Sequence, residues 1–442
     1  MNHIEKNNCN NTFFGKKEIN MDAKKIENAY NLAKERYISI GIDTEKVISE
    51  LSKIPISLQC WQGDDVGGFE QPNKALSGGG IQATGNYLGK PRNLDEFRAD
   101  VDKALSLIPG KHRLNLHASY LENKGAFLDR NEIGPEHFEG WVEWAKERKM
   151  GLDFNPTYFS HPKASDGFTL SHKDNGIRQF WIEHGIACRT IGEYMGKELG
   201  TPTIVNFWIP DGFKDIPVDR LQPRERLADS LDKIFTKELD ARFIKDSVEP
   251  KLFGIGAESY TAGSHEFYIG YTISRKKLIT IDSGHYHPTE GIADKISSVV
   301  MFVPEILLHI SRPVRWDSDH VVILNDDLLG TAQEIIRCQR IGKINIGLDF
   351  FDASINRIAA WVIGSRSTIK ALLMAMLEPL EQLQNFELNG DYTSRLAMLE
   401  ELKTMPFAAV WDYYCMKNNV PVGSQWLNIV KEYEQKVLIN RK

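Results

Sequence analysis

The chain has 442 residues, of which 42% are hydrophobic and 26% are charged, and its formal net charge is −6 at pH 7. This balance is typical of a soluble folded protein, and the acidic charge disfavours nucleic-acid binding, which depends on clustered lysine and arginine. No apolar run approaches the roughly 18 residues of a membrane span, so we expect a protein that acts on a small molecule, with no nucleic-acid or membrane partner.

The first residues of the chain predict no folded element. Residues 1–20 are rich in Asn and Lys and have no hydrophobic period, which predicts a disordered extension. From Ile26 to Tyr37 the apolar residues follow helical spacing, and Gly41 ends that run. We therefore expect the folded part to begin with a helix shortly after Met21.

The cysteines indicate the compartment. They are odd in number, scattered and without CxxC spacing, which is typical of free thiols in a reducing cytosol. The N-terminus also lacks the apolar stretch of a secretion signal. We expect a cytoplasmic protein with these residues as free thiols: Cys9, Cys60, Cys188, Cys338 and Cys415.

Short apolar runs alternate with longer amphipathic segments along the chain, the pattern of repeated βα units. Eight such units predict an α/β fold of the closed (β/α)8 TIM-barrel type. The expected strands are Ile56–Trp61, Leu114–Ser119, Gly151–Asn155, Thr203–Trp208, Ile244–Lys251, Lys277–Asp282, Leu307–Ser311 and Ile344–Phe350. The expected helices between them are Asn93–Ile108, Glu136–Lys149, Ile177–Leu199, Pro223–Glu238, Ile292–Pro304 and Asp326–Arg340.

The fifth strand is the least distinct, because Leu252–Tyr260 is also apolar, although its glycines favour a loop. Beyond Phe351 the pattern is helical through Met376, then again over 392–403 and 425–438. We expect a catalytic barrel over residues 21–365. A helical C-terminal extension over 366–442 would pack on the barrel or on a neighbouring subunit.

Residues that bind metal ions gather at the ends of the last four strands. In this fold the working residues project from the carboxyl ends of the strands. An isolated Asp after a strand is more often a helix cap, but independent caps have no reason to accumulate at four consecutive strand ends. The candidate ligands are Glu249, Asp282, His285, His309, Asp317, Asp319 and Asp349.

Carboxylates outnumber imidazoles in this set and no thiolate takes part, which favours Mn²⁺ over structural zinc, with Zn²⁺, Co²⁺ or Mg²⁺ as alternatives. Seven ligands exceed the need of one octahedral ion with bound substrate, so we expect two adjacent positions. If residues 317–319 are extended, Asp317 and Asp319 point to the same side and can hold one ion.

The first half of the barrel predicts a sugar-binding surface. Aromatic rings stack on the C–H faces of sugars, while His and Asp bond hydroxyl groups. Trp61 and Trp208 could equally be core residues, whereas a buried His117 within an apolar strand needs a hydrogen-bonding partner. The candidate substrate-binding residues are Trp61, His117, Phe159, Trp208 and Asp211, with Asn155 nearby.

Long uninterrupted motifs of this chain closely resemble those of bacterial L-rhamnose isomerases, from about Met21 to the C-terminus. These motifs are Cys60-Trp61-Gln62-Gly63-Asp64-Asp65, Asn115-Leu116-His117-Ala118, Asn206-Phe207-Trp208-Ile209-Pro210-Asp211-Gly212, Val248-Glu249-Pro250-Lys251, Asp282-Ser283-Gly284-His285, Arg312-Pro313-Val314-Arg315-Trp316-Asp317-Ser318-Asp319-His320 and Gly347-Leu348-Asp349-Phe350-Phe351-Asp352.

The resemblance implies a metal-dependent barrel related to xylose isomerase, a cytoplasmic homotetramer that acts in rhamnose catabolism. It implies that the fifth strand ends at Glu249-x-Lys251 and that 254–263 is loop. It also implies the ligand roles. Glu249, Asp282, His309 and Asp349 would hold a structural metal, His285, Asp317 and Asp319 a catalytic metal, and Asp282 would bridge the two.

These roles lead to a hypothesis for aldose–ketose isomerisation of L-rhamnose. The hydrogen on C2 passes to C1 as hydride, because the carboxylates that could serve as an enediol base are committed to metal. In this scheme Lys251 stabilises negative charge at O1, Asp349 or Asp319 steers the proton between O2 and O1, and His117 assists ring opening. The competing route is a cis-enediol formed by a base.

Three other functions stay open at this stage. The chain could isomerise a related aldose. It could be a metal-dependent phosphodiesterase or nuclease barrel, although its acidic balance disfavours the basic groove that such an enzyme needs. It could also be a non-catalytic sugar-binding module, which would leave the carboxylate cluster unexplained.

Overall fold

The computed structural model describes residues 23–70, 83–122, 127–254 and 256–441, so the expected extension over 1–20 lies outside the described residues. Eight parallel strands close into a barrel in the order β1-β10-β9-β8-β6-β4-β3-β2, which confirms the predicted fold. These strands are β1 Ile56–Gln59, β2 His112–His117, β3 Gly151–Asn155, β4 Thr203–Trp208, β6 Ile244–Glu249, β8 Leu278–Asp282, β9 Ile306–Ile310 and β10 Ile344–Leu348.

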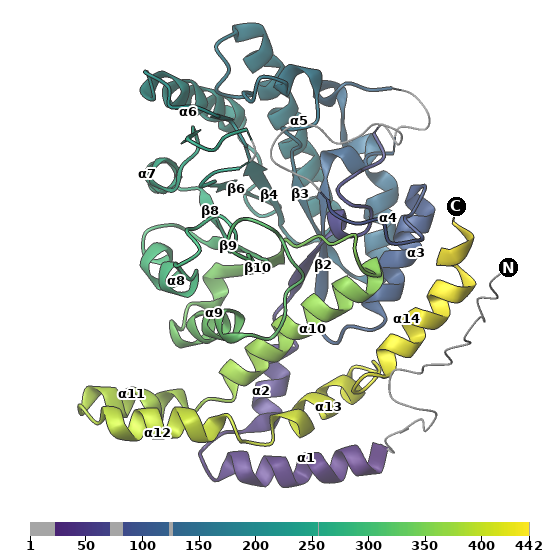
Figure 1. Ribbon diagram of the computed structural model, residues 1–442, viewed down its shortest axis with the longest axis vertical. Helices are drawn as coiled ribbons and strands as arrows, with labels where there is room; N and C mark the ends of the chain where they lie inside the picture. The colour runs from purple at the N-terminus through teal and green to yellow at the C-terminus, as the bar shows by residue number, and fades with distance from the viewer. Residues whose placement is uncertain (1–22, 71–82, 123–126, 255, 442) are drawn as a thin grey trace, which may run out of the picture.

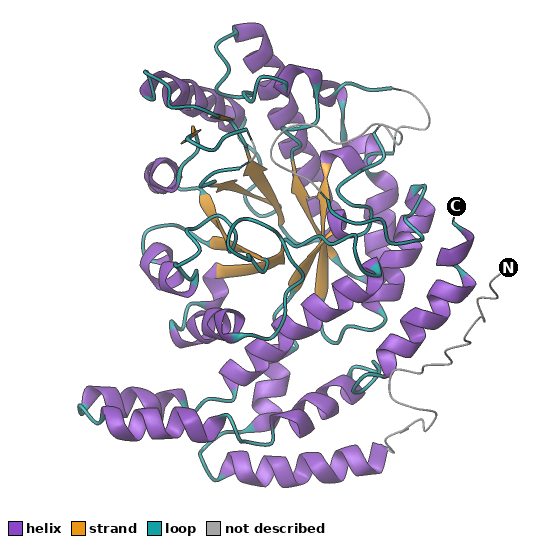
Figure 2. Ribbon diagram, in the orientation of Figure 1, coloured by secondary structure: helices purple, strands orange, loops and turns teal. Residues whose placement is uncertain are grey.

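Helices surround the barrel (Figure 2). The helices that follow strands are α3 Leu94–Leu105, α4 Glu139–Arg148, α5 Asn175–Leu199, α6 Leu221–Thr236, α7 His265–Arg275, α8 Ala293–Val300, α9 Asp326–Arg337 and α10 Arg357–Met376. Side chains before several of them accept hydrogen bonds from the first turn, as Asn93 does for α3, Asp174 for α5 and Asn325 for α9. Of these helices, only α7 had no expected counterpart.

The fifth barrel strand ends where the resemblance implied. Strand β6 stops at Glu249, and Pro250 and Lys251 follow it. The stretch expected to be loop contains one short strand, β7 Tyr260–Thr261, which pairs antiparallel with β5 Gly212–Phe213. This two-stranded sheet ties the segment after β6 to the segment after β4, at the carboxyl ends of both strands.

The two ends of the described chain pack together outside the barrel. Helix α1 Ala23–Ile38 buries Ile26, Tyr30, Ala33 and Tyr37, the residues with helical spacing. Tyr30 stacks on Tyr413 with ring centroids 3.8 Å apart. The remaining helices are α2 Thr44–Leu51, α11 Leu380–Leu388, α12 Tyr392–Leu402, α13 Phe407–Lys417 and α14 Gln425–Lys436.

Helices α11 and α12 form a hairpin that projects from the body of the molecule, and α13 and α14 run back along its side (Figure 1). Neither α11 nor α13 was expected from the sequence. The expected boundary at residue 365 lies inside α10, so the division of the chain into barrel and extension stays a prediction.

Helix α10 corrects one expectation. Contrary to the reading of the sequence, this 20-residue helix is long and apolar enough to cross a membrane by length and composition. However, 78% of its most apolar window is buried inside the protein, which is the behaviour of a core helix.

The described cysteines Cys60, Cys188, Cys338 and Cys415 are free thiols, and all but Cys338 are buried. Cys9 lies outside the described residues.

Candidate active site

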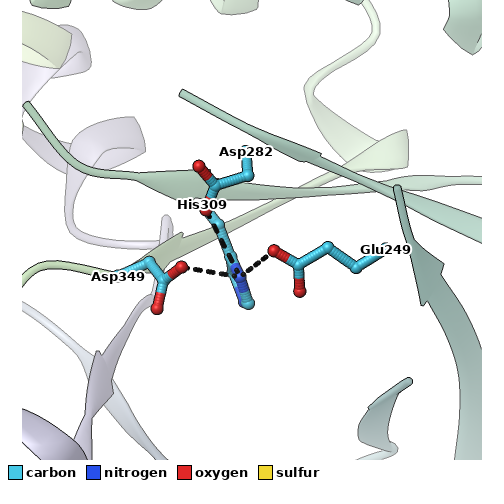
Figure 3. A group of neighbouring side chains, drawn as sticks. All are labelled: Glu249, Asp282, His309 and Asp349. Atoms are coloured by element: carbon cyan, nitrogen blue, oxygen red, sulfur yellow. Dashed lines mark hydrogen bonds and ion pairs between the residues drawn. The ribbon is translucent and has the colours of Figure 1, made fainter. Parts of the chain in front are cut away.

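Four of the predicted ligands converge at the carboxyl end of the barrel (Figure 3). Glu249 and Asp282 are the last residues of β6 and β8, His309 is the fourth residue of β9, and Asp349 directly follows β10. The strand register pairs Asp282 with His309. Because the parallel strands end at one rim, residues up to 100 positions apart in the sequence come together there.

The three carboxylates of this first group surround one imidazole nitrogen. His309 Nδ1 lies 3.3 Å from Glu249 Oε1, 3.5 Å from Asp349 Oδ2 and 3.9 Å from Asp282 Oδ2. One ligand atom from each of the four residues lies within 4.8 Å of the others. Ligands about 2.1 Å from a small divalent ion are separated by about 3 to 4.2 Å, so these four side chains can hold such an ion.

A second group shares Asp282 with the first. Asp282, His285 and Asp317 offer ligand atoms that all lie within 4.8 Å of one another, and His285 Nε2 is 3.3 Å from Asp317 Oδ2. Gly284 makes this approach feasible, because a Cβ at that position would lie 2.2 Å from Asp317 Oδ1 and 3.2 Å from Asp282 Oδ1. The two groups therefore adjoin, with Asp282 between them.

The backbone that carries Asp317 and Asp319 is not extended, so the reason given for pairing their carboxylates is wrong. Residues 312 and 320 form an antiparallel bridge that closes a loop, and Asp319 has a left-handed φ of 42°. The Asp319 carbonyl accepts a hydrogen bond from the Phe351 amide at 3.0 Å. Asp317 and Asp319 still line the same cavity. Of the two, only Asp317 belongs to the group of ligand atoms that lie within 4.8 Å of one another.

Burial of so many carboxylates sets the electrostatics of the site. Burial raises the pKa of Asp282, Asp319 and Asp349, with neighbouring carboxylates adding to the rise. Burial opposes protonation of His285 and His309, but the adjacent carboxylates outweigh it and raise the pKa of both imidazoles well above the ordinary value. Burial of ionised carboxylates is unfavourable in free energy unless a cation compensates their charge. The cluster would therefore be stabilised by a bound cation.

Unpartnered atoms point to the same requirement. Among the described residues, Asp317 Oδ1, His285 Nδ1 and His309 Nε2 are buried atoms with no hydrogen-bond partner. Buried polar atoms nearly always have a hydrogen-bond partner. Carboxylate oxygens and imidazole nitrogens are also the atoms that coordinate divalent ions in proteins. The residues present therefore fit a divalent metal.

Most of the candidate ligands line a cavity, and the predicted sugar-binding residues Trp61, His117 and Trp208 line the same cavity. Lys251 also lines this cavity, with its Nζ 4.7 Å from the centroid of the Trp208 ring. Burial lowers the pKa of Lys251, while the carboxylates of Asp317 and Asp319 favour its charged form. A basic side chain and aromatic rings thus share one small cavity with the candidate metal ligands.

Two predicted substrate-binding residues lie elsewhere. In the described part of the chain, neither Phe159 nor Asp211 is among the residues that line the cavity. The Phe159 ring lies behind the lining, 5.6 Å from the rings of both His117 and Trp208. Both Asp211 oxygens are engaged by the amides and hydroxyls of Thr169 and Ser171 at 2.6–2.8 Å, so this carboxylate holds a loop in place.

Three residues that line the cavity were not expected from the sequence: Val66, Asn206 and Phe351. Val66 has a φ of 61°, which is rare for a β-branched side chain, and no local pattern predicts it. Asp65 beside it is held by Arg357 through two contacts of 2.8 Å. A signal did exist for Asn206, which is a lone polar residue between Val205 and Phe207 in a buried strand.

The partner that His117 required is Thr157, whose hydroxyl lies 3.1 Å from His117 Nδ1. Burial lowers the pKa of His117 to about 3, so this imidazole is neutral at physiological pH. The Thr157 amide donates to His184 Nε2 at 3.0 Å, and His184 Nδ1 therefore carries the proton and donates to the Arg130 carbonyl at 2.9 Å. A second neutral imidazole thus supports the wall that carries His117.

We expect His184 to make the stability of the fold sensitive to acid. Burial lowers the pKa of His184 to about 3, whereas the unfolded value is about 6.5. Between these values the unfolded chain binds a proton that the folded chain does not, so stability falls with decreasing pH by about 1.4 kcal/mol per pH unit. In His184→Gln the slope of the unfolding free energy between pH 6.5 and 4, measured by urea denaturation, should be shallower by that amount. An unchanged slope would contradict this assignment.

The fold and the site together define a class: a (β/α)8-barrel enzyme whose candidate active site combines a buried carboxylate–histidine cluster able to hold metal with a cavity lined by tryptophan side chains. Residues 24–441 match the family described as L-rhamnose isomerase (RhaA). The chain belongs to the L-rhamnose isomerase family.

Curated relatives agree over nearly the full length. The chain is 58% identical to the L-rhamnose isomerase of Rhodopirellula baltica over 419 residues, which cover 95% of this chain and 98% of that protein. It is 58% identical to that of Klebsiella pneumoniae over 416 residues, which cover 94% and 99%. Among solved structures, an L-ribulose 3-epimerase matches with a TM-score of 0.48 and 12% identity. The match covers 73% of this chain and 95% of that chain. This likeness is too distant to bear on function.

Proposed function

We propose that the protein converts L-rhamnose to L-rhamnulose, an intramolecular oxidation and reduction between C2 and C1. The observation that carries this proposal is the adjoining pair of ligand groups that share Asp282 and face Lys251 and Trp208 in one cavity. Membership of the L-rhamnose isomerase family supports the substrate and does not favour the phosphodiesterase alternative.

The proposed cofactor is Mn²⁺ at two positions. Glu249, Asp282, His309 and Asp349 would hold one ion, and His285, Asp317 and Asp319 the other, with Asp282 reaching both. Oxygen donors outnumber nitrogen donors in both groups, which suits Mn²⁺. When bound, the metal would polarise the sugar carbonyl and lower the pKa of the adjacent hydroxyl.

The protein side chains would supply orientation and charge. Lys251 would stabilise negative charge at O1, since its ammonium is buried beside the cluster. Asp349 or Asp319 would steer the proton between O2 and O1. His117, neutral and oriented by Thr157, would assist ring opening through Nε2, because Nδ1 is already engaged. Trp61 and Trp208 would cover the C–H face of the sugar, with Phe159 packed behind Trp208 and His117.

We expect activity on L-rhamnose to depend on a divalent ion. Protein stripped with a chelator should lose activity, because the polarising charge is gone, and Mn²⁺ should restore it. A panel of aldoses that includes L-lyxose, L-mannose and D-allose, assayed for ketose after Mn²⁺ is returned, should give the highest kcat/KM with L-rhamnose. Full activity of the stripped protein would contradict the metal assignment, and a better substrate in the panel would contradict the choice of sugar.

Hydride transfer is the route we propose, because the described carboxylates that line the cavity, Glu249, Asp317, Asp319 and Asp349, are those proposed to hold metal. With L-rhamnose deuterated at C2, the label should appear at C1 of the ketose with little exchange into water. Mass spectrometry or NMR of the product measures this retention. Substantial loss of label to solvent would favour the enediol route instead.

We further propose a cytoplasmic homotetramer in which the α11–α12 hairpin contributes to subunit contact. Leu388, Tyr392 and Leu396 of this hairpin are large hydrophobic side chains that are exposed in the single chain, and exposed apolar surfaces of this kind mark interaction sites. Light scattering should then give the mass of four 50.3 kDa chains, and a monomeric mass would contradict this proposal.

A further inference from the structure

Beneath the first ligand group, the barrel interior is polar rather than apolar. Asn206 of β4, Ser247 of β6 and Thr280 of β8 lie two residues before Trp208, Glu249 and Asp282 on their strands. Residues two apart in a strand face the same side, so these three side chains form the layer under the ligands. Their exposed fractions are 1%, 0% and 0%. Branched apolar side chains usually fill such layers.

The three side chains form one hydrogen-bonded chain that ends on Glu249. Asn206 Nδ2 donates to Glu249 Oε2 at 2.6 Å, and Thr280 Oγ1 donates to Asn206 Oδ1 at 2.7 Å. Thr280 has a single hydroxyl proton and gives it to Asn206. Ser247 Oγ, 2.7 Å from Thr280 Oγ1, must therefore be the donor in the remaining contact.

The direction of this chain fixes the orientation of the Asn206 amide. The Glu249 carboxylate can only accept, so the amide NH₂ of Asn206 faces it, and the Asn206 oxygen is left to accept from Thr280. The Glu249 oxygen that Asn206 holds is Oε2. The other oxygen, Oε1, lies 3.3 Å from His309 Nδ1 and 3.4 Å from His285 Nδ1. One carboxylate oxygen is therefore tethered to the barrel and the other faces the metal-binding groups.

We propose that Asn206, oriented by Thr280 and Ser247, is a positioning residue that restrains Glu249 to bind metal through Oε1 alone. This inference rests on the proposed role of Glu249 as a metal ligand. Residues that orient metal ligands commonly change metal affinity about 10- to 100-fold when they are replaced. Asn206 touches a ligand rather than the reacting carbons, so its effect should reach catalysis through the metal.

The test measures Mn²⁺ affinity of the full-length protein by competition with a fluorescent chelator. We expect Asn206→Ala to weaken Mn²⁺ binding about 10- to 100-fold and to broaden the electron paramagnetic resonance spectrum of bound Mn²⁺. Thr280→Val removes the hydroxyl but keeps the shape, and should weaken binding about tenfold, because the Asn206 amide is then free to rotate. Thr280→Ser retains the hydroxyl and should bind Mn²⁺ as the parent does.

The matched control is Asn115→Ala. Asn115 is 3% exposed and lies in β2, and its side chain accepts a hydrogen bond from Asn155 at 2.6 Å. The substitution Asn115→Ala should leave the Mn²⁺ affinity unchanged. Equal losses in Asn115→Ala and Asn206→Ala, or equal affinity of Thr280→Val and Thr280→Ser, would overturn the inference alone. If the unsubstituted protein bound no divalent ion, that result would contradict the proposed function, and this inference would fail with it.

Discussion

Replacement of Asp282 by asparagine is expected to lower kcat/KM by about 10³- to 10⁴-fold. Asp282 is the one residue shared by the two ligand groups, so the substitution weakens both metal positions. Asparagine keeps the shape and can still accept the 2.5 Å hydrogen bond from the Gly284 amide. A bound metal contributes several kcal/mol to transition-state stabilisation, and each 1.4 kcal/mol corresponds to a factor of about ten in rate.

The stability of the same variant should change in the opposite direction. Without metal, burial and the neighbouring carboxylates of Asp349 and Glu249 raise the pKa of Asp282, so this carboxyl group disfavours the fold at neutral pH. Asparagine should therefore raise the thermal unfolding midpoint of the stripped protein. Metal content is measured by elemental analysis, and stability by calorimetry. Full metal content with full activity in Asp282→Asn would show that the metal centre lies elsewhere.

Asp153→Asn is the matched control for Asp282→Asn. Asp153 is also buried, but it pairs with Arg113 at 2.9 Å rather than with the ligand groups. Removal of one partner from a buried ion pair costs about 3–5 kcal/mol. The control should therefore lose stability while it retains metal, the reverse of the pattern expected for Asp282→Asn.

Lys251→Met should lower kcat about 10²- to 10³-fold, the usual cost of removing one group that stabilises a developing oxyanion. Methionine has a similar length and fills the space beside Trp208 without a charge. The metal content should not fall, because the substitution removes a cation that competes with metal for Asp317 and Asp319. Steady-state kinetics should place the loss in kcat more than in KM.

Lys245→Met provides the control for Lys251→Met. Lys245 lies in the same region of the chain, in β6, and its Nζ contacts Glu305 Oε2 at 2.6 Å outside the active-site cavity. Its replacement should leave kcat near the parent value. A similar loss of kcat in both variants would assign the effect to the barrel as a whole, and an unchanged kcat in Lys251→Met would exclude its proposed role at O1.

The sequence alone predicted the barrel and the assembly of the ligands, because both depend on local patterns. Most of the strands are short apolar runs, and Asp282, His309 and Asp349 each lie at or next to the end of such a run. Strand β6, Ile-Lys-Asp-Ser-Val-Glu, is not such a run, and its end at Glu249 was implied by the family resemblance. Once the strands are parallel and closed, their ends must share one rim. Position relative to a strand end was therefore sufficient to bring residues distant in the sequence together.

Tertiary structure alone decided what the loops and the interior layers do. Asp319 owes its left-handed backbone to a loop closed by the 312–320 bridge and anchored by Phe351. Asp211 is engaged by Thr169 and Ser171, which lie 42 and 40 positions away. Asn206 in β4 donates to Glu249 in the neighbouring strand β6, 43 positions away in the sequence. The periodicity of apolar residues indicates which face of a strand or helix is buried. The hydrogen-bond partners of these side chains depend on how distant segments pack together, which no local pattern encodes.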